Sequence, residues 1–591
     1  MEKYFELKER YVQENIRLKN KLNWLSTIRL ILALLAIYCG YNYFKINELY
    51  YLIAFFVSTS LFIVVVNIHQ KINRQRNLIQ QLITINEVEI AYFSEGKMPF
   101  YNGEAFINHQ HFYSYDLDIF GTNSLYQHLN RTAIYIGREK LAELFNKRLT
   151  NEAIILNQKA VKELAEKIIW RQKLTALGKI AADNELNYRQ LITWASAESP
   201  QKISKLGLFI AYLVPTCFII SLVIYVFTNI NQYYYLASNF FFINLIISFL
   251  YYKKIKSEII EADNINKIIS SYGLMFKAFE NEKFQSEKLV QFQQQLTHKS
   301  TLVSKEIKRL SVLFASLQTV QNIMGAILFN GAILYHVHTL NILLKWKKNN
   351  AHRINNWLAI IGEIEALNSL ANFSYNNPLF VFPTVNENFE VNFEALGHPL
   401  IHHKKRVCNN INFNSNTLVI LTGSNMSGKS TFLRTIGINL VLAGVGSAIC
   451  AKKANIHPLD VLVSMRQTDS LANSESYFLA EVKRLQAIMN KLNQSVCFVL
   501  LDEILKGTNS NDKQAGTIAI IKKLVTQKAI GLIATHDLAV CKMADNYPHN
   551  LVNKCFEVAI VNNELVFDYQ LQTGVCKNKT ATFLMQKMAI I

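Results

Sequence analysis

The stretch GSNMSGKST, residues 423–431, separates two glycines by four residues and follows the second with a lysine and a serine. This GxxxxGK[ST] pattern lets backbone N–H groups wrap around phosphates when a strand enters the loop and a helix leaves it. Lys429 would then reach the β- and γ-phosphates of a nucleotide, and the Ser430 hydroxyl would bind Mg²⁺. The residues predicted to contact the nucleotide are Gly423, Ser424, Asn425, Met426, Ser427, Gly428, Lys429, Ser430 and Thr431.

Two further polar clusters follow apolar runs that fit buried strands. Asp502 and Glu503 come directly after residues 496–501, and His536 ends the run AIGLIATH. Asp502 would hold Mg²⁺, while Glu503 would orient and polarise an attacking water. A histidine at a strand tip can sense the γ-phosphate. We therefore predict ATP and Mg²⁺ as cofactors, Lys429, Glu503 and His536 as catalytic residues, and Ser430 and Asp502 as Mg²⁺ ligands.

The segment DSLANSESYFLAEVKRLQAIM, residues 469–489, lies between the lysine and the carboxylates. Its small polar residues precede a helix with apolar residues on one face. Ser474 and Ser476 would stand at the start of that helix, where hydroxyls and free N–H groups can bind an anion. The alternative is a simple capped helix with no ligand.

The elements that must position these groups change in character along the chain. Short β-rich runs alternate with helical patterns after residue 380, which indicates an α/β domain. Between residues 253 and 379 the pattern is helical. No proline occurs between Pro215 and Pro378, which favours long helices.

Four apolar runs occur in two close pairs, at residues 27–44 and 49–67 and at residues 206–228 and 233–252. Each is close to the roughly 20 residues that cross a bilayer as a helix. Basic residues flank both pairs, which predicts two transmembrane hairpins with both chain ends in the cytoplasm. The alternative is a pair of buried hairpins in a soluble core. A further run, residues 324–344, contains asparagines and histidines, and we expect a buried core helix there rather than a fifth crossing.

The composition excludes a disordered chain, because half of the 591 residues are hydrophobic. The formal net charge of +19 suits an anionic partner, either nucleic acid or a membrane surface. Eight scattered cysteines form no CxxC pair, which argues against a disulfide framework or structural zinc.

The motifs TGSNMSGKST, DSLANSESYFLAE, LLDEILKGTNSND and ATHD stand in the order seen in the MutS family of DNA mismatch-repair ATPases, which residues 390–591 resemble. Residues 116–145 resemble the start of that family's helical core, and residues 365–378 its end. The resemblance implies a dimer in which Ser476 of one copy completes the ATP site of the other. Ser424 and Ser427 depart from the family loop, and Arg406 falls near a position where an aromatic often stacks on adenine.

Where the family has a mismatch-reading domain, this chain has mostly an apolar hairpin, so it resembles a shortened, membrane-anchored branch. The expected fold class is α plus α/β, with two transmembrane hairpins, a helical core and a C-terminal P-loop (ABC-type) ATPase domain. We expect an ATPase that binds DNA, membrane lipid and a second copy of itself; the alternative is a membrane mechanochemical or scaffold ATPase without a nucleic-acid role. The expected segments are 1–112, 113–205, 206–252, 253–379 and 380–591.

Overall fold

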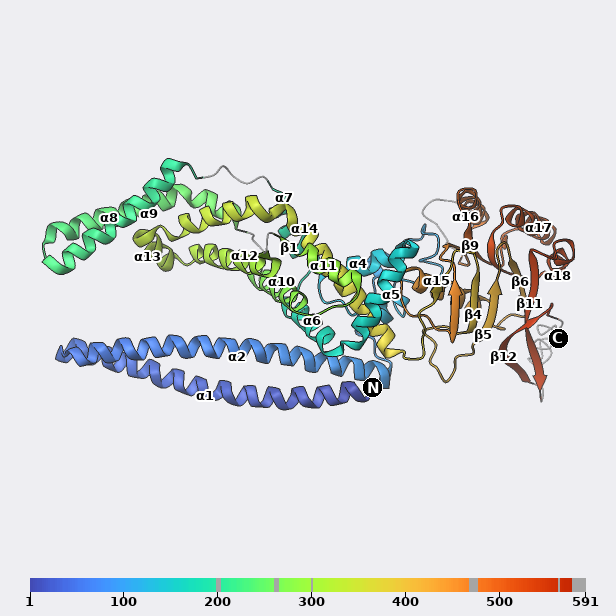
Figure 1. The fold of residues 1–591 in the computed structure, drawn as a ribbon, viewed down its shortest axis with the longest axis horizontal. Helices are drawn as coiled ribbons and strands as arrows, with labels where there is room; N and C mark the ends of the chain where they lie inside the picture. Colours follow the sequence, from blue (N-terminus) through green and yellow to red (C-terminus); the bar gives the residue numbers. More distant parts are fainter. Residues whose placement is uncertain (198–202, 260–264, 299–300, 467–476, 562–563, 577–591) are drawn as a thin grey trace.

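The computed structural model describes residues 1–197, 203–259, 265–298, 301–466, 477–561 and 564–576. Figure 1 shows an elongated chain with a helical part at one end and a mixed α/β part at the other. The change between them falls after helix α14, at residues 377–383, where prolines and asparagines interrupt the helical pattern.

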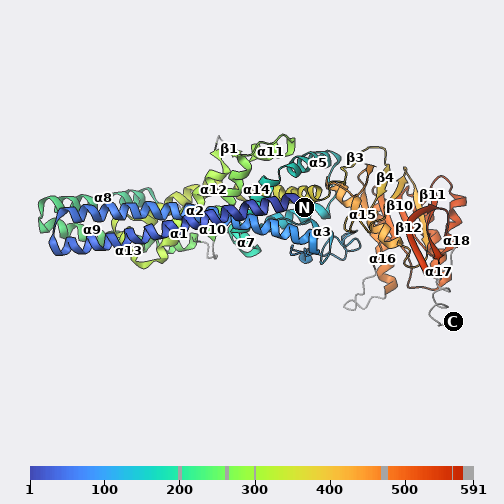
Figure 2. The same cartoon turned by 90° about the horizontal axis from the view of Figure 1, so that it is seen from below.

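Two long helices, α1 (Glu2–Ile46) and α2 (Leu49–Glu95), lie side by side and run in opposite directions (Figures 1 and 2). Asn47 turns the chain between them in the left-handed conformation, with φ 56°, which asparagine tolerates better than most residues. The halves near this turn are apolar and exposed. The opposite halves pack on α6 (Ile168–Ala181) through Tyr4, Leu7 and Ile79.

A second pair, α8 (Lys205–Thr228) and α9 (Asn231–Glu258), turns at Asn229. Its turn lies at the same end of the molecule as the turn between α1 and α2, far from the α/β part (Figure 1). Helix α8 continues through Pro215, which is buried.

These four helices are long and apolar enough to cross a membrane. Only 6–17% of the residues in their most apolar stretches are buried within the chain. The described chain therefore does not bury these helices in its own core, contrary to the alternative of hairpins buried within the chain. An exposed apolar surface of this extent marks a site for contact with lipid or with another protein.

Between and after these pairs lies a helical core, built around the 42-residue helix α14. Most of its apolar residues, including Trp357 and Leu367, are almost completely buried. The core elements are η1 (Glu104–Phe106), α3 (Leu125–Leu129), α4 (Tyr135–Asn146), α5 (Asn151–Glu166), α6, α7 (Glu185–Ser196), α10 (Ile265–Glu280), α11 (Glu287–Gln295), β1 (Thr297–His298), β2 (Thr301–Leu302), α12 (Val303–Gln318), η2 (Thr319–Gln321), α13 (Ile323–Ile333) and α14 (Tyr335–Asn376).

The expectation of one buried helix over residues 324–344 is wrong in its first half. Leu334 adopts a left-handed conformation, with φ 49°, and divides the run between α13 and α14. The part that belongs to α14 is buried, but Met324 and Leu328 on α13 are 78% and 62% exposed. The polar residues that suggested a core helix lie mostly near and after the break.

The α/β part contains a six-stranded sheet in the order β12-β11-β6-β10-β9-β8, in which only β12 is antiparallel to its neighbour. The central strands β6, β9 and β10 are buried at every residue, as expected for a parallel sheet covered on both faces. A four-stranded sheet, β3-β7-β4-β5, lies beside it. The strands and helices are β3 (Thr384–Val385), β4 (Val391–Leu396), β5 (Asn409–Phe413), β6 (Leu418–Gly423), α15 (Lys429–Gly444), β7 (Lys453–Ile456), β8 (Asp460–Ser464), α16 (Tyr477–Leu492), β9 (Cys497–Asp502), α17 (Ser510–Thr526), β10 (Ile530–Ala534), α18 (Leu538–Cys541), α19 (Met543–Asn546), β11 (Leu551–Val561) and β12 (Glu564–Thr573).

Candidate nucleotide-binding site

The loop 424–428 connects the buried strand β6 to the helix α15. Gly428 precedes the helix with φ 97°, a conformation that favours glycine. At Gly423, a built Cβ would lie 2.5 Å from Ser427 Oγ, so this position admits no side chain without movement. Asn425 and Met426 are exposed at the tip of the loop. Ser430 and Thr431 lie in the first turn of α15, and of the residues predicted to contact the nucleotide, Ser427 and Lys429 are buried.

Lys429 folds back over this loop. Its Nζ donates to the carbonyl oxygens of Gly423 and Ser424 at 2.9 and 3.0 Å. Burial lowers its pKa, although the carboxylates of Glu503 and Asp502 act in the opposite direction. The ammonium group therefore occupies the mouth of the loop, where an anionic ligand would compensate it better than neutral carbonyls do.

Ser430 and Asp502 come from different elements and meet at the same edge of the sheet. The Ser430 hydroxyl donates to Asp502 Oδ2 at 2.5 Å. The second oxygen of Asp502, Oδ1, is buried and has no hydrogen-bond partner among the described residues. A hydroxyl and a carboxylate oxygen with free coordination capacity are the hard donors that Mg²⁺ prefers, so the residues present fit this ion.

Glu503 follows Asp502 in the left-handed conformation, with φ 50°. Its Oε1 lies 2.5 Å from His536 Nε2, and its Oε2 lies 3.3 Å from Lys506 Nζ. The hydrogen bond from His536 is the main reason that the pKa of Glu503 is lowered to about 2. Glu503 is therefore an ionised carboxylate at neutral pH, as a group that polarises water must be.

His536 Nε2 also lies 3.3 Å from Lys429 Nζ. Lysine can only donate, and a carboxylate can only accept. When Nε2 carries a proton, it can donate a hydrogen bond to Glu503. When it carries none, it can accept a hydrogen bond from Lys429. The strand order explains the meeting of these groups, because β10, which carries His536 just beyond its end, lies between β6 and β9.

Ser474 and Ser476, the residues predicted to reach a second copy, lie outside the described residues. The helix that follows them, α16, contacts the site within the same chain. Glu481 on α16 accepts the backbone N–H groups of Leu505 and Lys506 at 2.6 and 3.2 Å. This carboxylate, which the sequence analysis did not identify, fixes the backbone just beyond Glu503.

A cavity of about 310 Å³ adjoins the loop and is lined in part by Met426, Gly428 and Tyr569. Tyr569 lies on β12 at a bulge, where the pairing with β11 skips from Leu571 to Phe567, and such bulges often re-aim a side chain. Sequence reasoning missed Tyr569, because a lone tyrosine in an exposed hairpin carries no distinctive pattern.

Arg406, which the resemblance places near an adenine-stacking position, does not line this cavity. Its guanidinium donates twice to the carbonyl oxygen of Ile401, at 3.0 and 2.7 Å, and lies over the Phe380 ring. The neighbouring residues Lys405 and Val407 line the cavity instead. Three aromatic side chains line this space, Phe432, Phe556 and Tyr569, and of these only Tyr569 is exposed.

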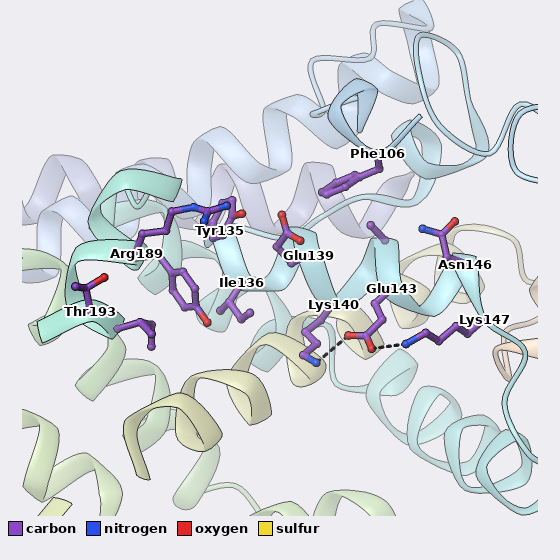
Figure 3. A pocket seen from close by; sticks show the side chains of 13 residues that line it. Phe106, Tyr135, Ile136, Glu139, Lys140, Glu143, Asn146, Lys147, Arg189 and Thr193 are labelled. Carbon is purple, nitrogen blue, oxygen red and sulfur yellow. Dashed lines mark hydrogen bonds and ion pairs between the residues drawn. The ribbon is translucent and has the colours of Figure 1, made fainter. Parts of the chain in front are cut away.

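A larger hollow of about 750 Å³ lies on the helical part, between α4 and α7 (Figure 3). Its charges largely neutralise one another. Glu143 contacts Lys140 and Lys147 at 2.9 and 3.1 Å. Its lining has three basic and two acidic side chains and contains none of the residues predicted to contact the nucleotide, so the loop 424–428 remains the better candidate.

Residues 116–118 of the helical part contact the α/β part. Asp116 Oδ1 accepts the backbone N–H groups of Met465 and Arg466, both at 2.8 Å. On the other side, a Cβ built on Gly437 of α15 would lie only 2.7 Å from Leu117. A movement of α15 would therefore act directly on residues 116–118 of the helical part.

Comparison with known proteins finds similarity in the C-terminal region that contains the candidate site. The family model for MutS domain V matches residues 419–589. The DNA mismatch repair protein MutS of Clostridium botulinum is 31% identical over 230 residues, which are 37% of this chain and 24% of that protein. The protein of that name from Clostridium perfringens is 30% identical over 230 residues, 37% of this chain and 25% of that protein. The match thus spans about a quarter of the length of these relatives.

The matched region begins in β6 and includes the loop, α15, β9, β10 and β12. It therefore contains the whole cluster of Lys429, Ser430, Asp502, Glu503 and His536, together with Tyr569. This C-terminal region is therefore similar to domain V of the MutS family.

Proposed function

We propose that this chain is a membrane-anchored, MutS-like ATPase that uses ATP hydrolysis to change its grip on DNA. The observation that carries the ATPase proposal is the meeting of Lys429, Ser430, Asp502, Glu503 and His536 at one edge of a parallel sheet. Such an edge, outside the carboxyl ends of the strands, is where ligands bind in open α/β sheets.

In the proposed mechanism, Lys429 exchanges the carbonyls of Gly423 and Ser424 for the β- and γ-phosphates. Ser430 and Asp502 would hold Mg²⁺, which would supply positive charge beside the phosphates. Glu503, kept ionised by His536, orients water toward the γ-phosphate. The cavity beside Tyr569 receives the adenine base.

The family resemblance supports a dimer. Within one copy, Glu481 of α16 contacts the segment after Glu503. We propose that Ser474 and Ser476 of a second copy close the γ-phosphate side, as the family resemblance implies. The copies would be confined to one membrane plane, which raises their effective concentration.

The arrangement of the four apolar helices supports the anchoring. Both turns point away from the α/β part (Figure 1), and basic residues stand on the core side of each pair, such as Lys71 and Arg74 after the first and Lys253 and Lys254 after the second. This is the distribution expected if the core and the ATPase region lie on the cytoplasmic side.

A second candidate, a mechanochemical ATPase without a nucleic-acid role, is favoured by the connection between the first helix pair and the core. Glu89 on α2 forms an ion pair with Arg131, and their side chains are 4% and 9% exposed. Asn372 on α14 donates to the same carboxylate at 3.1 Å. Breaking such a buried pair leaves an uncompensated charge, so motions of α14 would be passed to the helices α1 and α2.

The ATPase is tested with the purified full chain in detergent. We expect Lys429→Ala to lose ATP binding, and Glu503→Gln to bind ATP normally while turnover falls about 100-fold or more. Wild-type turnover in Glu503→Gln would show that this carboxylate does not activate the water. Binding is measured by calorimetry and turnover by phosphate release.

The same preparation separates the two candidates. Under the DNA proposal, affinity for branched or mismatched duplexes falls steeply with added salt, because phosphate contacts release counterions. If DNA binding is no stronger than that of a basic control protein, the mechanochemical candidate replaces it. Protease mapping in intact cells tests the anchoring, and an α/β part exposed on the outer side would refute the topology.

A further inference from the structure

Helix α13 stands apart from the other core helices. It has 11 residues, is bent by 106° from α12 and ends at Ile333. Leu334, in the left-handed conformation, separates it from α14. Figures 1 and 2 show it at the end of the core that faces the apolar helix pairs, beside α9.

Its side chains are apolar on almost every side. Six of its eleven residues are large apolar side chains that are at least 41% exposed, namely Ile323, Met324, Ile327, Leu328, Phe329 and Ile333. The exposed side chains of α8 and α9 have the same character, for example Phe227 at 84% and Phe249 at 78%. A helix that is apolar all round is buried in a core or in lipid, and the described chain does not bury this one.

The polar groups of α13 are satisfied internally. Asn330 is 3% exposed, and its Oδ1 accepts the backbone N–H of His336 at 3.0 Å. Asn244 on α9 is completely buried and donates to the carbonyl oxygen of Gly331 at 2.9 Å. This contact satisfies a carbonyl near the end of α13, where a helix has no partner of its own. Backbone groups at membrane depth must find partners in the protein.

The contact with α9 also indicates how deep α13 would lie in the bilayer. Asn244 lies nine residues before Lys253, where the basic flank begins, which corresponds to roughly 13 Å along a helix. The hydrocarbon core of a bilayer is about 30 Å thick. The Gly331 end of α13 would therefore lie near the middle of the bilayer, while both of its neighbours, α12 and α14, return to the core.

We propose that α13 is a re-entrant element that enters the cytoplasmic leaflet beside α9 and leaves on the same side, with lipid acyl chains covering Met324, Leu328 and Phe329. This inference rests on the proposed membrane anchoring. It would place a lipid-embedded wedge at the end of α14, the helix that also extends to the ATPase side. The continuity of its exposed apolar surface with that of α8 and α9 favours lipid over a second copy of the chain as the occupant.

The test uses the full chain in lipid vesicles, with Cys217, Cys408 and Cys576 replaced by serine. A spin label is placed at Leu328→Cys, at Leu213→Cys on α8 as the lipid reference, and at Leu274→Cys on α10 as the aqueous reference. Collisions with oxygen, which concentrates in lipid, and with a water-soluble nickel chelate are measured. We expect Leu328→Cys to match Leu213→Cys, with high oxygen and low nickel accessibility.

The outcomes are distinguishable. If Leu213→Cys is in lipid but Leu328→Cys collides with nickel as Leu274→Cys does, the inference is wrong while the anchoring stands. If Leu328→Cys is shielded from both reagents, a protein surface covers α13, which also overturns it. If Leu213→Cys itself is aqueous, the anchoring fails and the inference with it.

A matched pair of glycines tests the seating on α9. A Cβ at Gly331 would lie 2.2 Å from the Phe241 ring, whereas one at Gly325 meets only Asn322, at 3.7 Å. Gly331→Leu should therefore displace α13 from α9 and change the accessibility at Leu328→Cys, and Gly325→Leu should not. Equal effects of the two substitutions would contradict the proposed seating.

Discussion

Replacing Tyr569 with alanine tests whether the cavity beside the loop 424–428 holds the base of ATP. A Cβ built on Gly428 would lie 3.0 Å from Tyr569 Cδ1, so this ring borders the phosphate loop directly. Stacking of a base on an aromatic side chain contributes about 1–3 kcal/mol. Because the residue is 42% exposed, part of its ring remains free for a base to cover.

We expect the lower half of that range, since part of the ring already contacts protein. A loss of about 1–2 kcal/mol corresponds to a rise of about 5- to 30-fold in the Kd for ATP. Tyr569→Phe keeps the ring and should change the Kd by less than about two-fold. Calorimetric titration with ATP measures both, and circular dichroism confirms that each variant is folded.

Inorganic triphosphate provides a control without a base. Tyr569→Ala should leave its affinity unchanged, because Lys429 and the loop N–H groups remain in place. An equal loss of affinity for ATP and triphosphate would mean that Tyr569 acts through the shape of the loop. An unchanged Kd for ATP would refute the placement of the base in this cavity.

Three further predictions concern other contacts. Ser476→Arg should bind ATP but not hydrolyse it, and mixing it with Lys429→Ala should restore about half of the activity if Ser476 completes the site of a second copy; mixed dimers that remain inactive would contradict this. Because the His536 contact lowers the pKa of Glu503 to about 2, the stability that Glu503 contributes is present above its unfolded pKa of about 4.3 and is lost as pH falls toward 2. The drop in Tm caused by Glu503→Gln at pH 7 should therefore shrink at pH 3, and a constant difference would argue against the contact. Glu365, a buried residue of α14, should show the opposite pH dependence. Burial raises its pKa to about 8, so the stability that it contributes is present below about pH 4.3 and is lost as pH rises to 8. Relative to Glu365→Gln, the wild-type Tm should fall between pH 5 and pH 8, and parallel profiles would contradict a protonated Glu365.

Much of the α/β part and of the site could be predicted from local pattern. The loop motif, the apolar runs before Asp502 and His536, and the four apolar helices each depend on neighbours in sequence, so periodicity and residue type were sufficient. The helix pairs differ from the prediction mainly in length. Helices α1 and α2 are 45 and 47 residues long in total, so they extend well beyond their apolar runs. Their amphipathic halves pack on the core, which no apolar run could indicate.

Other features depend on contacts between distant segments. The break at Leu334 follows from the packing of α14 in the core and of Gly331 against α9. The two halves of residues 324–344 are alike in residue composition, so the sequence predicted that both would lie in the core. Likewise, the guanidinium of Arg406 reaches the carbonyl of Ile401 and does not line the cavity, whereas Tyr569, which lies at a bulge in an edge strand, does line it.

The sequence by itself determined which groups can do chemistry: an ammonium, a hydroxyl, two adjacent carboxylates and an imidazole, each at the end of a strand or the start of a helix. Only the tertiary structure decided that they lie together. The order of β6, β10 and β9 in the sheet brings His536 within 2.5 Å of Glu503 and within 3.3 Å of Lys429. Strand order is set by the burial of whole faces of the sheet, a property of long-range packing that no single motif contains.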